Sequence, residues 1–351
     1  MGTNSGIRYD PPLMAQKRFP VPEWRPPEGH GRRRARFPRG LEYLLFRCLE
    51  TAILSLPYRR AVILSRLLAR IAHVADRKHR KTARRNLAAA FPDWSPAKVR
   101  AVTRRMYEHF ALVLVELFFT RRRVRPSTFR RYATFAGWEG IQRVLAEGRG
   151  LVIVVGHLGN WEFAAYASAL NGLPVTSIAR PLDNRRINDH LLGLRVATGQ
   201  EIVYKYDALR RMIASLRENR ALVIPSDQNV RGEAGIFVPF FGRDASTIRS
   251  TALLCRKYGI PYTVATHVRT DPDRFHYRIE FSPPTDPARF EGTKDPLREI
   301  TADFTGQLER YIRERPEQYL WMHKRWKTRP AGERPDAAAD AGAPVVTSKR
   351  P

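Results

Sequence analysis

The sequence has few cysteines and no long apolar run. Cys48 and Cys255 are the only cysteines, which excludes a disulfide framework and a zinc site of four cysteines and fits a reducing, cytoplasmic environment. No stretch reaches the ~18 to 20 uncharged apolar residues that mark a transmembrane helix. Residues 1–40 also lack the apolar segment of a secretory signal.

Acidic residues are scarce relative to basic ones. The chain has 62 Lys and Arg against 34 Asp and Glu, a formal net charge of +28. Such an excess implies an anionic partner, which can be nucleic acid, a membrane surface or an acidic protein. Charge is the only argument for nucleic acid, because the sequence contains no zinc-ligand spacing, no RNA-binding aromatic signature and no recognisable docking helix. We therefore expect an anionic membrane surface or an acidic protein, and no nucleic acid.

Composition and patterning divide the chain into four predicted segments. Residues 1–40 are rich in proline and contain an arginine cluster, which is typical of a disordered basic arm attracted to lipid headgroups. Residues 41–131 predict a helical, membrane-associating region, and residues 132–330 predict an α/β domain. Residues 331–351 predict a disordered tail, because they are rich in Ala, Pro and Gly.

Two basic amphipathic helices are predicted within residues 41–71, on either side of Pro57. Apolar residues recur there at helical spacing with arginines between them, a pattern typical of helices that lie on a membrane surface. The alternative is that both helices pack against the rest of the protein in the ordinary way. A long helix is predicted from Pro96 to about Phe119, and its apolar end can line an acyl-chain groove or join the core.

Beyond residue 132, strands and helices are predicted to alternate. Leu151–Val155 is an uninterrupted apolar run, as expected for a strand that is buried on both faces of a parallel sheet. The predicted fold class is α/β, with a mostly parallel central sheet flanked by helices and with N-terminal amphipathic, membrane-associating helices.

His157 lies in the turn that leaves this strand, and Glu162 lies in the first turn of the next predicted helix. In open α/β sheets, ligands bind at the carboxyl ends of the strands. Across such a turn, Glu162 can accept a hydrogen bond from one imidazole nitrogen and leave the other nitrogen free as a base. The alternative is a loop histidine followed by an acid that only favours the helix N-terminus.

The backbone of the same turn suggests a second function. Gly159 permits a tight turn, and Asn160 can cap the helix. The N–H groups near Gly159 to Trp161 can then stabilise an oxyanion that forms beside the base.

Arg180 and Asp227 each follow another predicted strand, so both should emerge at the same edge as His157. The guanidinium of Arg180 suits bidentate recognition of a phosphate. Asp227 can orient His157, hold an acceptor hydroxyl or cap the loop that follows it.

Residues 156–162, Gly-His-Leu-Gly-Asn-Trp-Glu, resemble the H-x4-D/E block of the lipid A biosynthesis acyltransferases, within the broader glycerolipid acyltransferase group. Residues 177–184, 227–229, 235–242 and 316–330 agree with that family in the same order. The last block interleaves aromatics with cations, which fits a lipid–water interface or a helix packed on the catalytic domain. The resemblance covers roughly residues 41–330, with a departure at Asn229, where many members carry an acid.

The resemblance implies a peripheral O-acyltransferase at the cytoplasmic face of the cell inner membrane. It implies that His157 and Glu162 are catalytic and that substrate is bound by Arg180, Asp227, Gly159 and Asn160. The implied donor is acyl carrier protein or acyl-CoA, the implied acceptor is a hydroxyl of a lipid A precursor or related glycolipid, and no metal or cofactor is required. The alternatives are an acyl-CoA-dependent glycolipid or lysophospholipid acyltransferase and, in a different class, a non-catalytic lipid-binding protein.

Overall fold

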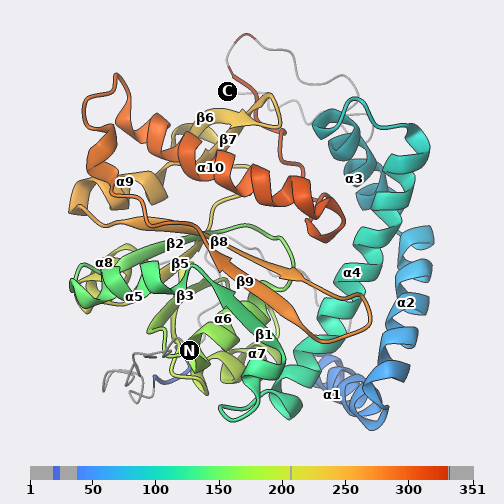
Figure 1. Cartoon of the computed structure of the whole chain (residues 1–351). Helices are drawn as coiled ribbons and strands as arrows, with labels where there is room; N and C mark the ends of the chain where they lie inside the picture. The colour runs from blue at the N-terminus through green and yellow to red at the C-terminus, as the bar shows by residue number, and fades with distance from the viewer. Residues whose placement is uncertain (1–18, 24–37, 206–207, 331, 333–351) are drawn as a thin grey trace, which may run out of the picture.

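The computed structural model describes residues 19–23, 38–205, 208–330 and 332 (Figure 1). In chain order the helices and strands are α1 (Arg39–Ser55), α2 (Tyr58–Ala75), α3 (Arg77–Ala90), α4 (Pro96–Arg123), β1 (Ala133–Ala136), α5 (Trp138–Ala146), β2 (Leu151–Val155), α6 (Trp161–Leu170), β3 (Val175–Ala179), α7 (Arg185–Val196), β4 (Glu201–Tyr204), α8 (Ala208–Arg217), β5 (Ala221–Pro225), β6 (Gly235–Phe240), β7 (Arg243–Ile248), α9 (Arg249–Tyr258), β8 (Tyr262–Arg269), β9 (Tyr277–Phe281) and α10 (Pro296–Glu314).

A seven-stranded sheet forms the centre of the molecule, in the order β1-β9-β8-β2-β5-β3-β4 (Figure 1). β2 pairs in parallel with β5 and β8, and β3 pairs in parallel with β4 and β5. At the other side β9 is antiparallel to β8 and parallel to β1. β6 and β7 form a separate antiparallel ribbon. The predicted α/β fold with a mostly parallel sheet is confirmed.

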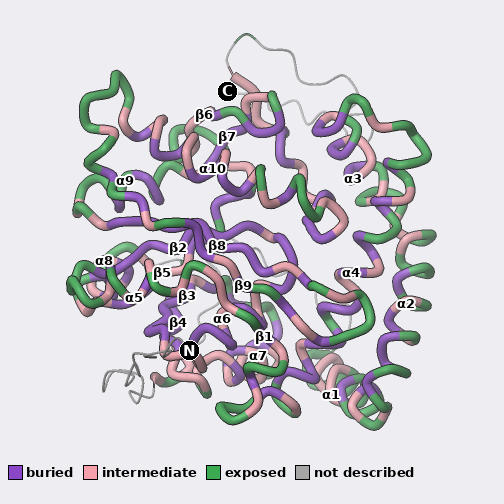
Figure 2. Tube along the Cα trace, viewed as in Figure 1, coloured by how far each residue is buried: buried purple, intermediate pink, exposed green. Residues whose placement is uncertain are grey.

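The central strand β2 is covered by helices on both faces. Its side chains Leu151, Ile153 and Val155 belong to a buried cluster with residues of α4, α5 and α6. Val152 and Val154 point the opposite way, into a cluster with residues of α8, α9 and α10. Because successive side chains of a strand alternate between faces, an unbroken apolar run is what a doubly covered strand requires. Figure 2 shows this strand buried along its length.

The N-terminal helices pack on one side and expose apolar residues on the other. Apart from Tyr58, the buried face of α2 consists of small or branched residues that lie against α4: Ala61, Val62, Ser65 and Ala69. Its exposed face carries Ile63, Leu67, Leu68, Ile71 and Val74, and α1 similarly exposes Leu41, Leu44, Leu45 and Leu49. Packing against the rest of the protein is therefore confirmed for one face of each helix, and the other face of each helix exposes apolar side chains to solvent. Within the described chain, no helix is long and apolar enough to cross a membrane.

Part of the predicted disordered arm is packed against the domain. Most of residues 1–40, and all of residues 331–351 except Gly332, lie outside the described residues. Within residues 19–23, the ring of Phe19 lies 4.6 Å from the guanidinium of the buried Arg220. Val21 packs against Leu192 and Ile202. The prediction of disorder is therefore wrong for residues 19–23, because these two side chains cover apolar and cationic groups at the β4 edge of the sheet.

A buried carboxylate joins the N-terminal helices to the sheet. Glu116 of α4 is fully buried and accepts hydrogen bonds of 2.6 Å from the hydroxyls of Tyr58 in α2 and Tyr277 in β9. It also forms an ion pair with Arg269 of β8. A charge held in the interior needs such partners, because its desolvation is otherwise uncompensated.

Replacing Glu116 by alanine should lower the free energy of unfolding by about 3–5 kcal/mol, because the Arg269 cation then remains buried without its partner. The measurement is urea denaturation followed by circular dichroism. Glu108→Ala is the matched control on the same helix, since Glu108 lies 3.9 Å from a mostly exposed Arg104 and should cost less than about 1 kcal/mol. Equal losses in the two variants would contradict a stabilising role for the buried network.

Candidate active site

The turn between β2 and α6 is held in one conformation by its glycine and its cap. Gly159 has a φ of +68°, and an added Cβ would overlap the carbonyl oxygen of His267. Only glycine fits both the conformation and the space. The Asn160 side-chain oxygen accepts a hydrogen bond of 3.0 Å from the Phe163 amide, so the predicted helix cap is confirmed.

His157 is paired with Asp227 at the carboxyl edge of the sheet. β2 and β5 are parallel neighbours with Val155 opposite Pro225. His157 and Asp227 each lie two positions beyond the end of their strand, so they lie side by side. His157 Nδ1 lies 2.8 Å from Asp227 Oδ1, and the His157 amide donates to Oδ2 at 2.8 Å. Asp227 therefore orients the imidazole, one of the roles that its position predicted.

The second ring nitrogen of His157 faces a more accessible group. The side-chain amide of the exposed Gln228 lies 3.3 Å from His157 Nε2. With the Nδ1 proton donated to Asp227, Nε2 carries the lone pair and accepts from this amide. The imidazole therefore has the tautomer of a general base whose free nitrogen faces away from its carboxylate.

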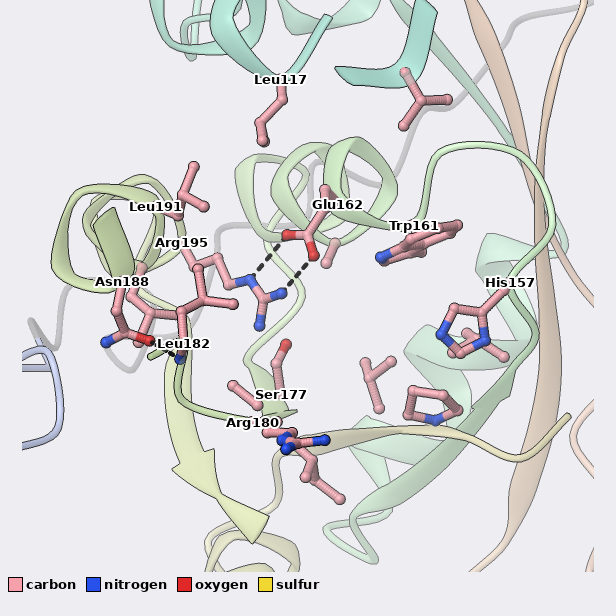
Figure 3. A pocket seen from close by; sticks show the side chains of 18 of the residues that line it. Leu117, His157, Trp161, Glu162, Ser177, Arg180, Leu182, Asn188, Leu191 and Arg195 are labelled. Atoms are coloured by element: carbon pink, nitrogen blue, oxygen red, sulfur yellow. Dashed lines mark hydrogen bonds and ion pairs between the residues drawn. The ribbon is translucent and has the colours of Figure 1, made fainter. Parts of the chain in front are cut away.

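Glu162 is paired with an arginine and not with His157. Arg195 of α7 donates to Glu162 through Nε at 2.9 Å and through Nη2 at 2.5 Å, a bidentate ion pair (Figure 3). The predicted hydrogen bond from the imidazole to Glu162 is wrong, because Asp227 takes Nδ1 and the planar guanidinium takes both oxygens of Glu162.

Two of the expected oxyanion donors are already used within the protein. The Gly159 amide donates to the Gln318 carbonyl at 2.9 Å, and the Asn160 amide donates to the His267 carbonyl at 3.3 Å. The prediction that these two amides serve the substrate is therefore wrong. Gly159 and Asn160 instead hold the turn against β8 and the chain after α10.

The C-terminal aromatic block closes over the site. Tyr319, Trp321 and Trp326 are buried in a cluster with α3, α4 and the β6–β7 ribbon. The Leu320 amide donates to the His157 carbonyl at 3.0 Å, and Tyr319 interacts with Asp227 through its hydroxyl. Of the two alternatives left open by the sequence, packing against the domain is confirmed for these three aromatics, but the expected helix is wrong, because they lie in non-helical chain that follows a short 3-10 helix at Pro316–Gln318.

A cavity of about 410 Å³ opens beside His157 and combines apolar walls with two arginines. Arg180 follows β3 and lines the cavity, as its position predicted, and the guanidinium of Arg195 lies inside it between Glu162 and Ser177 (Figure 3). The apolar wall comes from α4 and α7 and includes Val113, Leu114, Leu117, Leu191 and Leu192. This volume and mixed lining are typical of a small-molecule site. The apolar end of the long predicted helix does both: Leu114 and Leu117 line this cavity, whereas Val115, Phe118 and Phe119 join the buried core.

Charges set the protonation of the pair. Burial opposes ionisation of His157, but the charge of Asp227 and its hydrogen bond outweigh burial, so the pKa of His157 is raised above 6.5. Burial would raise the pKa of Asp227, but the charge and hydrogen bonds of His157 lower it to about 2. The neighbouring His109 and His267 are buried without an acid partner of this kind, and burial lowers the pKa of each to about 3. Of these three histidines, His157 is therefore the one placed to exchange a proton near neutral pH.

Arg195 is the site residue that the sequence did not predict. It lies in the last turn of a helix, where a cation is favourable for the helix dipole whatever else it does. No motif drew attention to it, and its pairing with Glu162 joins residues that are 33 positions apart.

The model of the bacterial lipid A biosynthesis acyltransferase family matches residues 30–328. The chain is 28% identical to the lipid A biosynthesis lauroyltransferase of Escherichia coli (strain K12), over 80% of this chain and 89% of that protein. It is 26% identical to the lipid A biosynthesis palmitoleoyltransferase of the same strain, over 79% and 88%. A solved structure of the 1-acyl-sn-glycerophosphate acyltransferase from Thermotoga maritima overlaps 74% of this chain and 97% of its own, with 15% identity and a TM-score of 0.36.

Replacing Asp227 by asparagine should lower the pKa of His157, because burial remains while the opposing charge is removed. The measurement is NMR titration of the His157 imidazole. In the unsubstituted protein, the pair should add to the free energy of unfolding over a limited range of pH. The part that comes from the raised pKa of His157 is lost as pH rises through that pKa. The part that comes from the lowered pKa of Asp227 is lost as pH falls from 3.8 towards about 2. Asp273→Asn, which removes an exposed and distant carboxylate, should leave the His157 titration unchanged. An unchanged His157 pKa in Asp227→Asn would contradict the assigned pairing.

Proposed function

Because the chain belongs to the bacterial lipid A biosynthesis acyltransferase family and is an acyltransferase, we propose that it transfers a fatty acyl chain from an acyl thioester to a hydroxyl of a lipid A precursor or a related glycolipid. The observation that carries the proposal is the His157–Asp227 pair at the mouth of a cavity that holds both apolar walls and arginines. A hydrocarbon chain suits the first surface and an anionic sugar lipid suits the second.

His157 acts as the base in the proposed reaction. The acceptor hydroxyl replaces the Gln228 amide at Nε2 and transfers its proton to the ring, while Asp227 stabilises the imidazolium that forms. The acceptor oxygen attacks the thioester carbonyl and forms a tetrahedral oxyanion. When this intermediate collapses, the carbon–sulfur bond breaks, and the leaving thiolate takes the proton back from His157.

Arg195 is the proposed donor to negative charge that develops in the cavity. Glu162 holds its Nε and Nη2, and this fork fixes the plane of the guanidinium inside the cavity. The role of Glu162 is thus to position Arg195, with a weaker electrostatic effect on His157. A preorganised cation of this kind costs no reorganisation when the oxyanion forms. Arg180 is the proposed partner of a phosphate on the acceptor.

The proposed donor is acyl carrier protein, which is acidic and therefore complementary to a chain of net charge +28. Acyl-CoA is the other thioester donor to test. The apolar wall formed by Leu114 and Leu117 of α4 and by Leu191 and Leu192 of α7 is the proposed contact for the acyl chain.

The proposed location is the cytoplasmic face of the inner membrane, with the protein attached peripherally. The exposed apolar faces of α1 and α2 support this attachment, because arginines flank them and such a face is stable against lipid. Residues 41–131 are thus proposed as a membrane-associating helical region, and residues 132–330 as the acyltransferase domain.

With purified protein, acyl carrier protein carrying a fatty acyl chain and a lipid A precursor, mass spectrometry should detect a product heavier by one acyl group. His157→Ala should lower the rate by about 10² to 10⁴, because the acceptor hydroxyl loses its base. His276→Ala is the control, since His276 lies outside the cavity and bonds Thr270. Normal turnover by His157→Ala would refute the mechanism, and no product with either thioester donor would refute the function.

A double-mutant cycle tests the proposed contact between Arg180 and the acceptor phosphate. Arg180→Ala should raise the KM for a phosphorylated acceptor and should have a much smaller effect on the dephosphorylated one, because the missing phosphate removes the same interaction. Arg180→Lys should restore only part of the loss, since an ammonium lacks the planar fork. Additive effects in the four combinations would show that Arg180 does not contact the phosphate.

A further inference from the structure

A group of basic residues surrounds the junction of α2 and α3, which a single residue, Asp76, separates. We define the α2–α3 corner as His73 at the end of α2, Arg77, Arg80, Lys81 and Arg84 of α3, and Arg104 of α4. Arg77, Lys81 and Arg104 are exposed, whereas His73, Arg80 and Arg84 are half-buried. The corner lies at the outer side of the molecule, away from the sheet (Figure 1).

The acids near the α2–α3 corner are not placed to neutralise it. Asp76 accepts hydrogen bonds from the His79 amide at 3.2 Å and from the Tyr107 hydroxyl at 3.2 Å, and it lies 2.9 Å from the His79 ring. Glu108 lies 3.9 Å from Arg104, which is a loose pair. Among the described residues, Arg77 and Lys81 form no ion pair. The corner therefore carries a net positive charge.

Two nitrogen atoms in the α2–α3 corner are buried without a partner. Within the described chain, neither Nε of Arg84 nor Nε2 of His73 has a hydrogen-bond partner. Burial lowers the pKa of His73, and Arg80, Arg84 and Arg104 lower it further through their charges. Three arginines on two helices thus make the electrostatic potential at the His73 imidazole more positive. A bound anion would lower that potential.

The α2–α3 corner directly follows the exposed apolar face of α2. In the last two turns of α2, Leu68, Ile71 and Val74 are 43%, 58% and 69% exposed. At a bilayer surface, acyl chains lie next to charged headgroups. A helix that exposes apolar side chains and then leads into a basic turn can therefore contact both layers. An acidic protein would satisfy the charge but would leave this apolar face uncovered.

We propose that the α2–α3 corner binds the anionic phosphate headgroups of a bilayer, with the apolar face of α2 inserted beside them. The inference rests on the proposed membrane association and adds the lipid class that the protein selects. Leu114, which lines the cavity, lies on the same helix as Arg104 and about 15 Å further along its axis. Headgroup binding at the corner would therefore hold the cavity close to the membrane that supplies a lipid acceptor.

Flotation tests the proposal with vesicles of phosphatidylcholine alone and of phosphatidylcholine mixed with anionic phosphatidylglycerol. The full chain should bind the mixed vesicles more tightly. Removing one surface cation should reduce binding to the mixed vesicles by about fivefold. The variant Arg77→Gln/Lys81→Gln/Arg84→Gln should therefore lose up to about a hundredfold. Binding to neutral vesicles should change little, because α2 is intact.

Arg210→Gln/Arg217→Gln/Lys257→Gln is the matched control, since it removes the same charge from exposed positions on α8 and α9, across the molecule from α3. It should keep the preference for anionic vesicles. An equal loss in the control would overturn the proposal in favour of net charge alone. The double variant Arg77→Gln/Lys81→Gln affects only exposed residues and should still lose about 25-fold, so misfolding around Arg84 cannot produce the result.

Acyl transfer in neutral detergent micelles separates this inference from the proposed function. The α2–α3 corner variant should match the unsubstituted protein there, because micelles contain no anionic headgroup. A raised KM for acyl carrier protein, with the vesicle preference retained, would overturn the proposal and assign the corner to the carrier protein. Absence of transfer by the unsubstituted protein would refute the proposed function while leaving the vesicle result to be judged by itself.

Discussion

The site depends on keeping one carboxylate charged inside the protein. Asp227 is 3% exposed, and burying an ion costs several kcal/mol unless donors replace the lost water. His157 supplies two of these donors, its amide and its ring. The charge of Arg325 and the hydroxyl of Tyr319 act on the same group from the C-terminal block. The tautomer of His157 therefore depends on three segments that must fold together: the turn after β2, the end of β5 and residues 316–326.

The two carboxylates of the site have separate partners, and this separation is what makes the arrangement chemically useful. Asp227 fixes the imidazole and is shielded from solvent, whereas Glu162 lines the cavity and fixes a guanidinium. If both acids faced His157, the cavity would contain an unpaired arginine and no oriented cation. The observed pairing leaves His157 Nε2 beside the exposed Gln228 amide and the Arg195 guanidinium inside the cavity that His157 lines (Figure 3), which suits the separate roles proposed for the two groups.

The sequence was sufficient for features that depend on local pattern. The apolar run of β2, the cap at Asn160 and the position of Arg180 after β3 follow from periodicity, turn chemistry and the geometry of parallel sheets. It was insufficient for contacts between distant segments. Which acid bonds to His157 depends on the register of β2 against β5 and on Arg195 from α7. The use of the Gly159 and Asn160 amides depends on Gln318 and His267, and no local pattern contains those partners.

α4 connects the surface that would face lipid with the base. One side chain, His109, lies 3.2 Å from the Gly159 carbonyl and supports the turn that carries His157. Further along, Glu116 ties the helix to β8 and β9 through buried partners. Because breaking such a buried network is costly, α4 is held against the sheet, and α2 is held against α4 by Tyr58. Contacts of α2 with a bilayer would then orient the whole domain without moving His157 relative to the cavity, which preserves the preorganisation that acyl transfer requires.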